Sequence, residues 1–157
     1  MEFTASLFHI LGLMLFGGGQ LWLALLISRA ENSPIPHAKF FVTKALPGLS
    51  VAMGIGILLL WGSGVGRLLI WGNQGLLFLP QLYGWILTTK ILLYVAITAN
   101  GIVIENRYIW VLARSVSQEP NEKFTQAWES LKFLSRTNLL LTMVVVALGE
   151  ALRFSPS

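Results

Sequence analysis

The strongest constraint on the fold of this chain is a series of four long apolar stretches. They cover approximately residues 5–28, 41–62, 82–104 and 137–154, and a helix needs about 17–25 apolar residues to cross a bilayer. Inside lipid the backbone must satisfy its own hydrogen bonds, so each stretch is expected to be helical. The sequence therefore predicts an all-α fold, an integral membrane four-helix bundle.

The composition agrees with a membrane protein and excludes several kinds of site. Of the 157 residues, 55% are hydrophobic and 11% are charged, whereas about 25% are charged in soluble domains. The length predicts a single transmembrane domain, residues 1–157. Because cysteine is absent, disulfides, thiolate nucleophiles and cysteine-based zinc or iron–sulfur sites are excluded. The net charge of +4 is explained by cytoplasmic loops, so no nucleic-acid partner is expected.

The first apolar stretch is interpreted as a retained helix, because no basic region precedes it and no small-residue cleavage site follows it. Residues 63–81 are apolar but interrupted by glycines and by Pro80. We expect this part to form a short interfacial segment between helices two and three, with a helix around residues 67–71. Trp71 and Tyr83 would then lie at the level of the lipid headgroups.

The distribution of Lys and Arg predicts the orientation of the bundle. The loops after the first and third stretches carry eight of these residues, and the opposite side carries Arg67 and Arg153. Because cytoplasmic loops are enriched in Lys and Arg, both termini are expected on the outer side. The eight cytoplasmic residues are Arg29, Lys39, Lys44, Arg107, Arg114, Lys123, Lys132 and Arg136.

Three polar residues are expected at a similar depth in roughly the outer third of the bilayer. They are His9 in the first helix, Lys90 in the third and Glu150 in the fourth. A buried cation usually has a partner, so Lys90 and Glu150 are predicted to form a structural ion pair. The alternative is that Glu150 and Arg153 lie among the headgroups while the Lys90 side chain extends outward to reach them.

His9 and Gln20 lie on nearly the same face of the first helix, close to Gly12 and Gly19. Such glycines would let another helix or a flat ligand approach closely. A histidine on this face is therefore either an axial haem ligand or an ordinary packing residue. His37 lies about a bilayer away, so a haem here would be five-coordinate or would take its second axial ligand from Lys, from a second subunit, or from Met53 or Met143.

The polar stretch 107–136 contains Trp110, Phe124, Trp128 and Phe133 among its charges. It predicts either a partner or lipid-surface helix, or helix ends that extend into water. The sequence has no Ser/His/Asp arrangement, phosphate-binding loop or catalytically spaced pair of carboxylates. Two distant histidines without cysteine also disfavour a preformed transition-metal site.

Four short motifs carry a resemblance to a known group of membrane proteins. They are His9 with Phe16-Gly-Gly-Gly-Gln20, then Pro47-Gly48 with Gly54, then Trp85-Ile-Leu-Thr-Thr-Lys90-Ile-Leu-Leu, and Arg136-Thr-Asn138. Together they resemble the HemJ-type protoporphyrinogen oxidase and copper-resistance CopD-like group. The resemblance touches all four spans.

This resemblance implies a four-helix bundle with a b-type haem ligated by His9. It places Lys90 near the tetrapyrrole as the candidate catalytic residue, and Gly12 and Gln20 on the cofactor-binding face. The chain departs from the HemJ-type pattern in one respect: those enzymes carry a histidine about three turns after the motif lysine, where this chain has Ala99-Asn100-Gly101. The polar stretch before the fourth helix is also long for the group.

Three functions follow as hypotheses. The first is a membrane protein that binds or handles a tetrapyrrole, with a redox role similar to that of protoporphyrinogen oxidase. The second is a non-catalytic accessory subunit of a respiratory or photosynthetic complex, and the third is transport of copper or a small solute. Whether the chain is an enzyme is left open. The expected partners are the lipid bilayer and other membrane subunits or further copies of the chain, in a bacterial inner membrane or thylakoid-type membrane.

Overall fold

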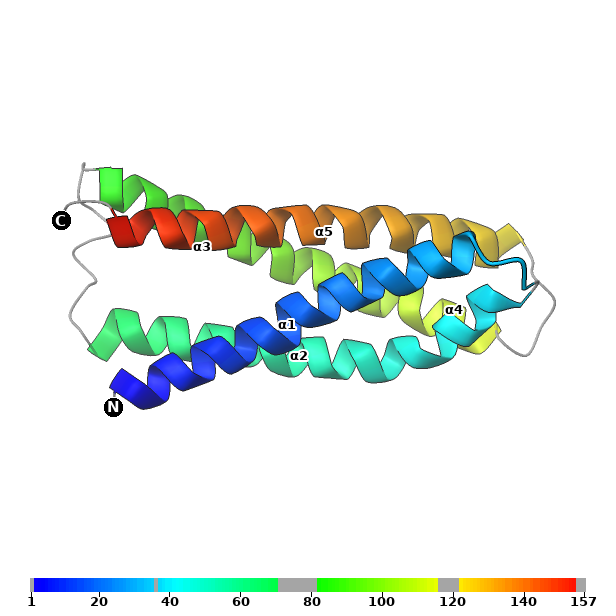
Figure 1. Cartoon of the computed structure of the whole chain (residues 1–157), viewed down its shortest axis with the longest axis horizontal. Coiled ribbons are helices and arrows are strands. Elements are labelled where there is room, and N and C mark those ends of the chain that lie inside the picture. Colours follow the sequence, from blue (N-terminus) through cyan, green and yellow to red (C-terminus); the bar gives the residue numbers. More distant parts are fainter. Residues whose placement is uncertain (1, 36, 71–81, 116–121, 155–157) are drawn as a thin grey trace.

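The computed structural model describes residues 2–35, 37–70, 82–115 and 122–154, which form a bundle of long helices (Figure 1). The helices α3, η2 and α4 follow one another without a break, and η2 is a π-helical turn. Together these three elements form one long helix. In the described part of the chain, four helices, this one included, are long and apolar enough to cross a membrane. The predicted all-α architecture is confirmed, and these four helices are consistent with the predicted four-helix bundle. The elements are α1 (Glu2–Glu31), α2 (Ala38–Ile70), α3 (Leu82–Val103), η2 (Ile104–Ile109), α4 (Trp110–Ser115) and α5 (Glu122–Phe154).

The helices are longer than the apolar stretches that predict them. Helices α1, α2 and α5 have 30, 33 and 33 residues, which at 1.5 Å per residue is about 45–50 Å, against about 30 Å of hydrocarbon. In particular, α5 begins at Glu122 and not near residue 137. Hydropathy marks only the part of a helix that lipid surrounds, and no Gly or Pro interrupts residues 122–136.

The end of α2 corrects the predicted interfacial segment. Residues 63–70 continue α2 and do not form a separate helix, while residues 71–81, including Trp71, lie outside the described residues. Glycine costs a helix about 1 kcal/mol in water. In lipid, an unpaired backbone group costs several kcal/mol, so the helix persists through its glycines and through Pro47.

Glycines bring α1 and α2 into close contact. A Cβ atom on Gly12 would lie 2.9 Å from the Gly56 carbonyl oxygen and 2.9 Å from Leu60 Cγ. One on Gly56 would lie 2.7 Å from the Phe16 backbone nitrogen. Real Cβ atoms do not approach other atoms so closely, so both positions require glycine. Small residues of this kind are a common basis of helix packing in membranes.

Amide side chains join α3 to α5. Asn100 Nδ2 donates to Asn138 Oδ1 at 2.7 Å and to the Leu134 carbonyl at 3.3 Å, and Asn138 is only 1% exposed. Between α2 and η2, Ser50 Oγ donates to Glu105 Oε2 at 2.6 Å. Interhelical hydrogen bonds of this kind replace the hydrophobic driving force that is missing between helices in lipid.

At the end of the bundle where α1 finishes and α5 starts, here called the basic end, the helices pack around a core. Phe124, Trp128, Leu131 and Leu112 are all 3% exposed or less. The prediction of a partner or lipid-surface helix is therefore wrong for Phe124 and Trp128, which fill the core between extended helices. Phe133 and Trp110 remain exposed.

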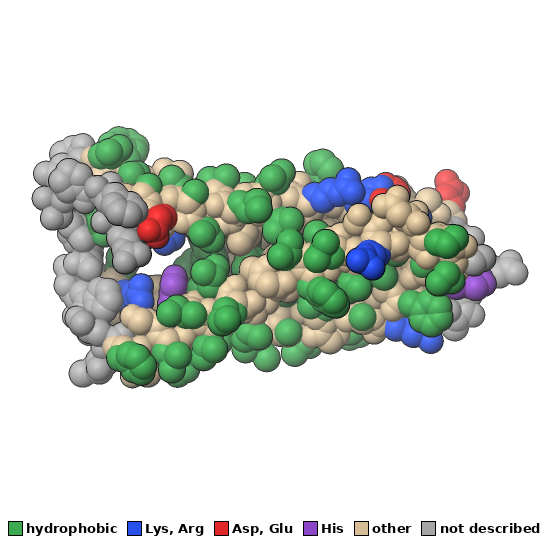
Figure 2. Space-filling model, in the orientation of Figure 1, with side chains coloured by type: hydrophobic (Ala, Val, Ile, Leu, Met, Phe, Trp, Pro, Cys, Tyr) green, Lys and Arg blue, Asp and Glu red, His purple; other side chains and the backbone are tan. Residues whose placement is uncertain are grey.

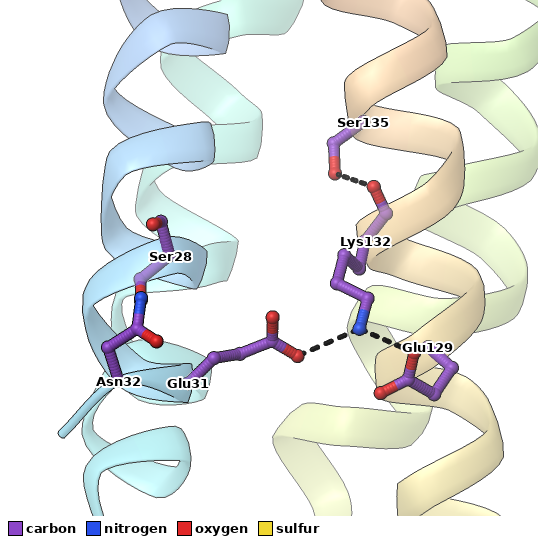
Figure 3. A network of polar contacts seen from close by, with 6 residues as sticks. All are labelled: Ser28, Glu31, Asn32, Glu129, Lys132 and Ser135. Atoms are coloured by element: carbon purple, nitrogen blue, oxygen red, sulfur yellow. Dashed lines mark hydrogen bonds and ion pairs between the residues drawn. The ribbon is translucent and has the colours of Figure 1, made fainter.

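Paired charges surround this core. Lys132 Nζ lies 2.9 Å from Glu31 Oε1 and 2.6 Å from Glu129 Oε2, and so joins α1 to α5 (Figure 3). The Lys39 ammonium lies 5.5 Å from the centre of the Trp128 ring. These exposed ion pairs each contribute about 0–1 kcal/mol, so they fix the register of the helices more than they stabilise them.

Candidate functional site

The two helix pairs separate toward the end at which α1 begins and α5 finishes (Figure 1). In Figure 2 the molecular surface is hollowed there, between the α1–α2 pair below and the α3–α5 pair above, and histidine, basic and acidic side chains lie around the hollow. This hollow is here called the opening. Its polar groups come from four helices: His9 from α1, Ser63 and Arg67 from α2, Lys90 from α3, with the Gly149 backbone from α5.

The hydrogen bonds of Ser63 favour one tautomer of His9. Its Nδ1 lies 3.0 Å from Ser63 Oγ, and the Ser63 hydroxyl donates its single proton to the Leu60 carbonyl at 3.2 Å. With the Ser63 proton assigned to the Leu60 carbonyl, the hydroxyl accepts from the imidazole, and the ring proton is then on Nδ1. The other ring nitrogen, Nε2, then carries a lone pair, which is the state that a metal ligand needs.

Two cations lie close to His9. Both Arg67 and Lys90 are within electrostatic range of its ring, and they are within range of each other. The Arg67 Nη2 atom donates to Ser6 Oγ at 2.9 Å, which connects α2 to the start of α1. A cation at depth costs about 2.5–3.5 kcal/mol to insert.

The Lys90 ammonium points at α5. A Cβ atom on Gly149 would lie only 3.0 Å from Lys90 Nζ, so the glycine leaves the space that the ammonium uses. Among the described residues the ion pairs are those of Lys132 with Glu31 and Glu129. The predicted pair of Lys90 with Glu150 is not among them, and Glu150 makes other contacts; that pair stays a prediction.

One turn deeper on α3, aromatic side chains connect α2 to α3. The Trp61 and Tyr94 ring centres are 5.1 Å apart, with 55° between the ring planes. Trp61 Nε1 donates to Thr98 Oγ1 at 3.2 Å, and the Tyr94 hydroxyl donates to the Ile57 carbonyl at 3.1 Å. Because Tyr94 follows Lys90 by one helical turn, this contact closes the opening on the side of the bundle centre.

The other predicted cofactor residues take part in helix packing or lie farther along α1. Gly12 lies in the α1–α2 contact, and Gly19 faces Met53, so both glycines serve close helix approach. Gln20 is 3% exposed, and its Oε1 has no hydrogen-bond partner among the described residues. It is eleven residues from His9, about 16 Å along α1, and therefore lies outside the opening.

The candidate second axial ligands are also distant from the opening. The Met53 side chain fills the α1–α2 contact at Gly19, Met143 is 60% exposed on the outside of α5, and His37 is exposed beyond the other end of α1. Of the residues predicted for the site, His9 and Lys90 are the two that the structure brings together.

Ser63 and Arg67 are the polar residues that the sequence prediction missed. They were assigned to an interrupted interfacial segment, which hid their place on α2. A spacing of four residues puts them on one face of a continuous helix, and that spacing was the signal available in the sequence.

Within the described ranges, no group of three or more His, Cys, Asp or Glu side chains is arranged to hold a metal ion. No family model, curated protein or solved structure matches the chain. The function must therefore be argued from the opening itself.

Proposed function

We propose that this multi-pass membrane protein binds a tetrapyrrole, a b-type haem, in the opening, with both termini on the outer side of the membrane. The observation that carries the proposal is the 3.0 Å contact between His9 Nδ1 and Ser63 Oγ. A hydrogen bond from Nδ1–H to a neighbouring oxygen, with Nε2 left as a ligand, is the usual arrangement of a metal-bound histidine.

The residues around the opening fit such a group. His9 would hold the iron, the Ser63 hydroxyl would orient the imidazole, and the pair of Trp61 and Tyr94 would border the ring on the side of the bundle centre. A bound haem supplies one-electron redox chemistry. Of the two histidines of the chain, His9 is the one near the opening and is therefore the residue that would hold the iron.

The proposed redox role, similar to protoporphyrinogen oxidase, is supported by the motifs around His9 and Lys90. Electrostatics gives Lys90 a specific part in it. A cation within range of His9 favours negative charge on a bound molecule, so Lys90 would hold an acidic or deprotonated ligand beside the iron. No other residue near the opening is assigned a catalytic role.

The test is the visible absorption spectrum of the purified protein, oxidised and reduced, after expression with haem supply. Wild type should show a Soret band and reduced α and β bands, and His9→Ala should lose them. His37→Ala is the matched control, because it removes the only other histidine, which is exposed and distant. A colourless wild type, or a His9→Ala variant with an unchanged spectrum, would overturn the proposal.

A non-catalytic subunit of a larger membrane complex is the second candidate. It is favoured by the same opening (Figure 2), which a helix of another subunit could fill. Blue-native electrophoresis of native membranes, solubilised in mild detergent, separates the two candidates. A subunit should migrate with a large assembly, and migration as a small free species would exclude this role.

A further inference from the structure

The end of α1 carries a polar pocket that the proposed function does not use. It lies at the basic end of the bundle, has a volume of about 380 Å³, and is lined by Ser28, Arg29, Asn32 and Ser33. The apolar stretch of this helix ends at about residue 28. In a bilayer the pocket is therefore expected at the level of the headgroups, where the lipid phosphates lie.

The pocket is rich in hydrogen-bond donors, and its described lining residues include no carboxylate. Arg29 is exposed and takes part in no ion pair of the described residues, so its five N–H groups can face a ligand. Ser33 Oγ accepts from the Ile35 backbone nitrogen at 3.2 Å, which leaves the hydroxyl proton to donate. Asn32 Nδ2 donates one proton to the Ser28 carbonyl at 3.0 Å and keeps the second. Such a set of donors fits an anion.

The negative charges near the pocket are engaged elsewhere. Glu31 extends toward α5, where Lys132 Nζ lies 2.9 Å from its Oε1 (Figure 3). The carbonyls at the end of a helix carry partial negative charge, and here the Ser28 carbonyl accepts from both the backbone nitrogen and Nδ2 of Asn32, at 3.2 and 3.0 Å. The charge that lines the pocket is therefore the guanidinium of Arg29.

An apolar stripe of α1 leads from the pocket toward the bilayer centre. Trp22, Leu25, Arg29 and Asn32 are spaced by three or four residues and so lie on one face of the helix. Trp22 is 58% exposed and Leu25 is 49% exposed, and both belong to the apolar stretch, where an exposed side chain contacts lipid chains. The face thus offers donors at the headgroup level and an apolar surface below them, which is the order of groups along a phospholipid.

We propose that this pocket binds the phosphate of an anionic phospholipid whose acyl chains lie against Trp22 and Leu25. A phosphate matches the planar guanidinium of Arg29. The described lining residues offer no carboxylate for the ammonium of a zwitterionic lipid, so the lipid expected here is phosphatidylglycerol and not phosphatidylcholine. His9 is twenty residues away on α1, about 30 Å, so the site does not depend on the haem proposal.

Native mass spectrometry of the full chain in detergent tests the proposal. The protein is titrated with phosphatidylglycerol or with phosphatidylcholine of the same chain length, and the complex with one lipid is quantified. Wild type should bind phosphatidylglycerol about fivefold or more tightly, the scale of one cation near a membrane surface. Arg29→Gln should bind the two lipids about equally. Ser28→Ala, which removes one donor, should bind phosphatidylglycerol about two- to tenfold more weakly.

Two further variants serve as controls. Lys123→Gln removes an exposed cation at the same end of the bundle, on α5, and should bind as wild type does. Arg29→Lys keeps the charge, so it should keep more of the preference than Arg29→Gln. Equal binding of the two lipids to wild type, or equal losses in Arg29→Gln and Lys123→Gln, would overturn the proposal, because any attraction would then belong to the basic end as a whole. Unchanged affinity of Ser28→Ala would also overturn it, since the phosphate would lie outside the pocket.

Glycerol phosphate distinguishes a lipid from a soluble phosphate as the occupant. It has the phosphate of the lipid without the acyl chains, so it gains nothing from Trp22 and Leu25 and should bind at least about tenfold more weakly than phosphatidylglycerol. Equal affinities for the two would assign the pocket to a soluble anion and would overturn the lipid.

Discussion

The close contact between α1 and α2 predicts that alanine at Gly56 destabilises the bundle, whereas alanine at Gly54, two residues away, does not. Gly56 lies under the backbone of α1, and an added Cβ would lie 2.7 Å from the Phe16 nitrogen and 3.0 Å from the Gly12 oxygen. Gly54, on the same helix, has nothing within 4 Å of that position. The two substitutions are therefore chemically identical, but the new methyl group meets the α1 backbone in Gly56→Ala and open space in Gly54→Ala.

The expected magnitudes follow from the distances. Alanine gains about 1 kcal/mol over glycine in a helix, and Gly54→Ala should be neutral or stabilising by up to that amount. For Gly56→Ala, moving from 2.7 Å to an ordinary contact of 3.4 Å requires the helices to part by roughly 0.7 Å. Overpacking of this kind costs about 1–3 kcal/mol, so after the gain of about 1 kcal/mol in helix propensity the net effect should be a loss of up to about 2 kcal/mol.

The assay is unfolding in mixed micelles with increasing SDS, followed by circular dichroism and tryptophan fluorescence. Gly56→Ala should unfold at lower SDS than wild type, and Gly54→Ala at the same or higher SDS. The same shift of α2 would lengthen the 3.0 Å contact between His9 and Ser63, so Gly56→Ala should also bind haem more weakly. If both variants unfold alike, the close approach of α1 and α2 is not as described.

The remaining predictions concern the opening. Ser63→Ala removes the acceptor of the His9 Nδ1 proton, and haem affinity measured by titration should fall about 10–100-fold with the Soret band retained; unchanged affinity would show that the hydroxyl does not orient the ring. The single variants Lys90→Gln and Glu150→Gln and their double variant test whether Lys90 forms the predicted ion pair or only the contact with Gly149. In SDS unfolding their effects should add within about 0.5 kcal/mol, and a coupling of about 1 kcal/mol or more would establish the ion pair.

The positions of the helices in the chain could be predicted from hydropathy, but their ends could not. Hydropathy responds to lipid contact, and it therefore missed the first turns of α5, where Trp128 and Leu131 are buried against protein instead. It also separated residues 63–70 from α2, because glycines lower the apolar content of a segment without breaking a helix that lipid surrounds.

The partners of polar residues were harder to predict than the helices. An ion pair between Lys90 and Glu150 was predicted only because the two residues are expected at a similar depth in the membrane, near the same end of the bundle. Which side chains meet also depends on the rotation of each helix, and this is set by contacts such as Gly12 against Gly56. Once α1 and α2 are fixed by those glycines, His9 meets Ser63 and Arg67 meets Ser6.

The contrast between the two ends of the bundle supports a ligand at the opening. At the basic end, Lys132 lies between two carboxylates, and the cost of placing a charge near the membrane is offset within the protein. Near the middle, Asn100 and Asn138 satisfy each other. At the opening, His9 contacts Ser63 and Arg67 donates to Ser6, which join α1 to α2, while Gly149 leaves the space that the Lys90 ammonium uses. A histidine whose Nδ1 is held by a hydroxyl beside a hollow of the bundle (Figure 2) is the arrangement that the proposed haem would use, and neither the basic end nor the amide contact in the middle of the bundle offers it.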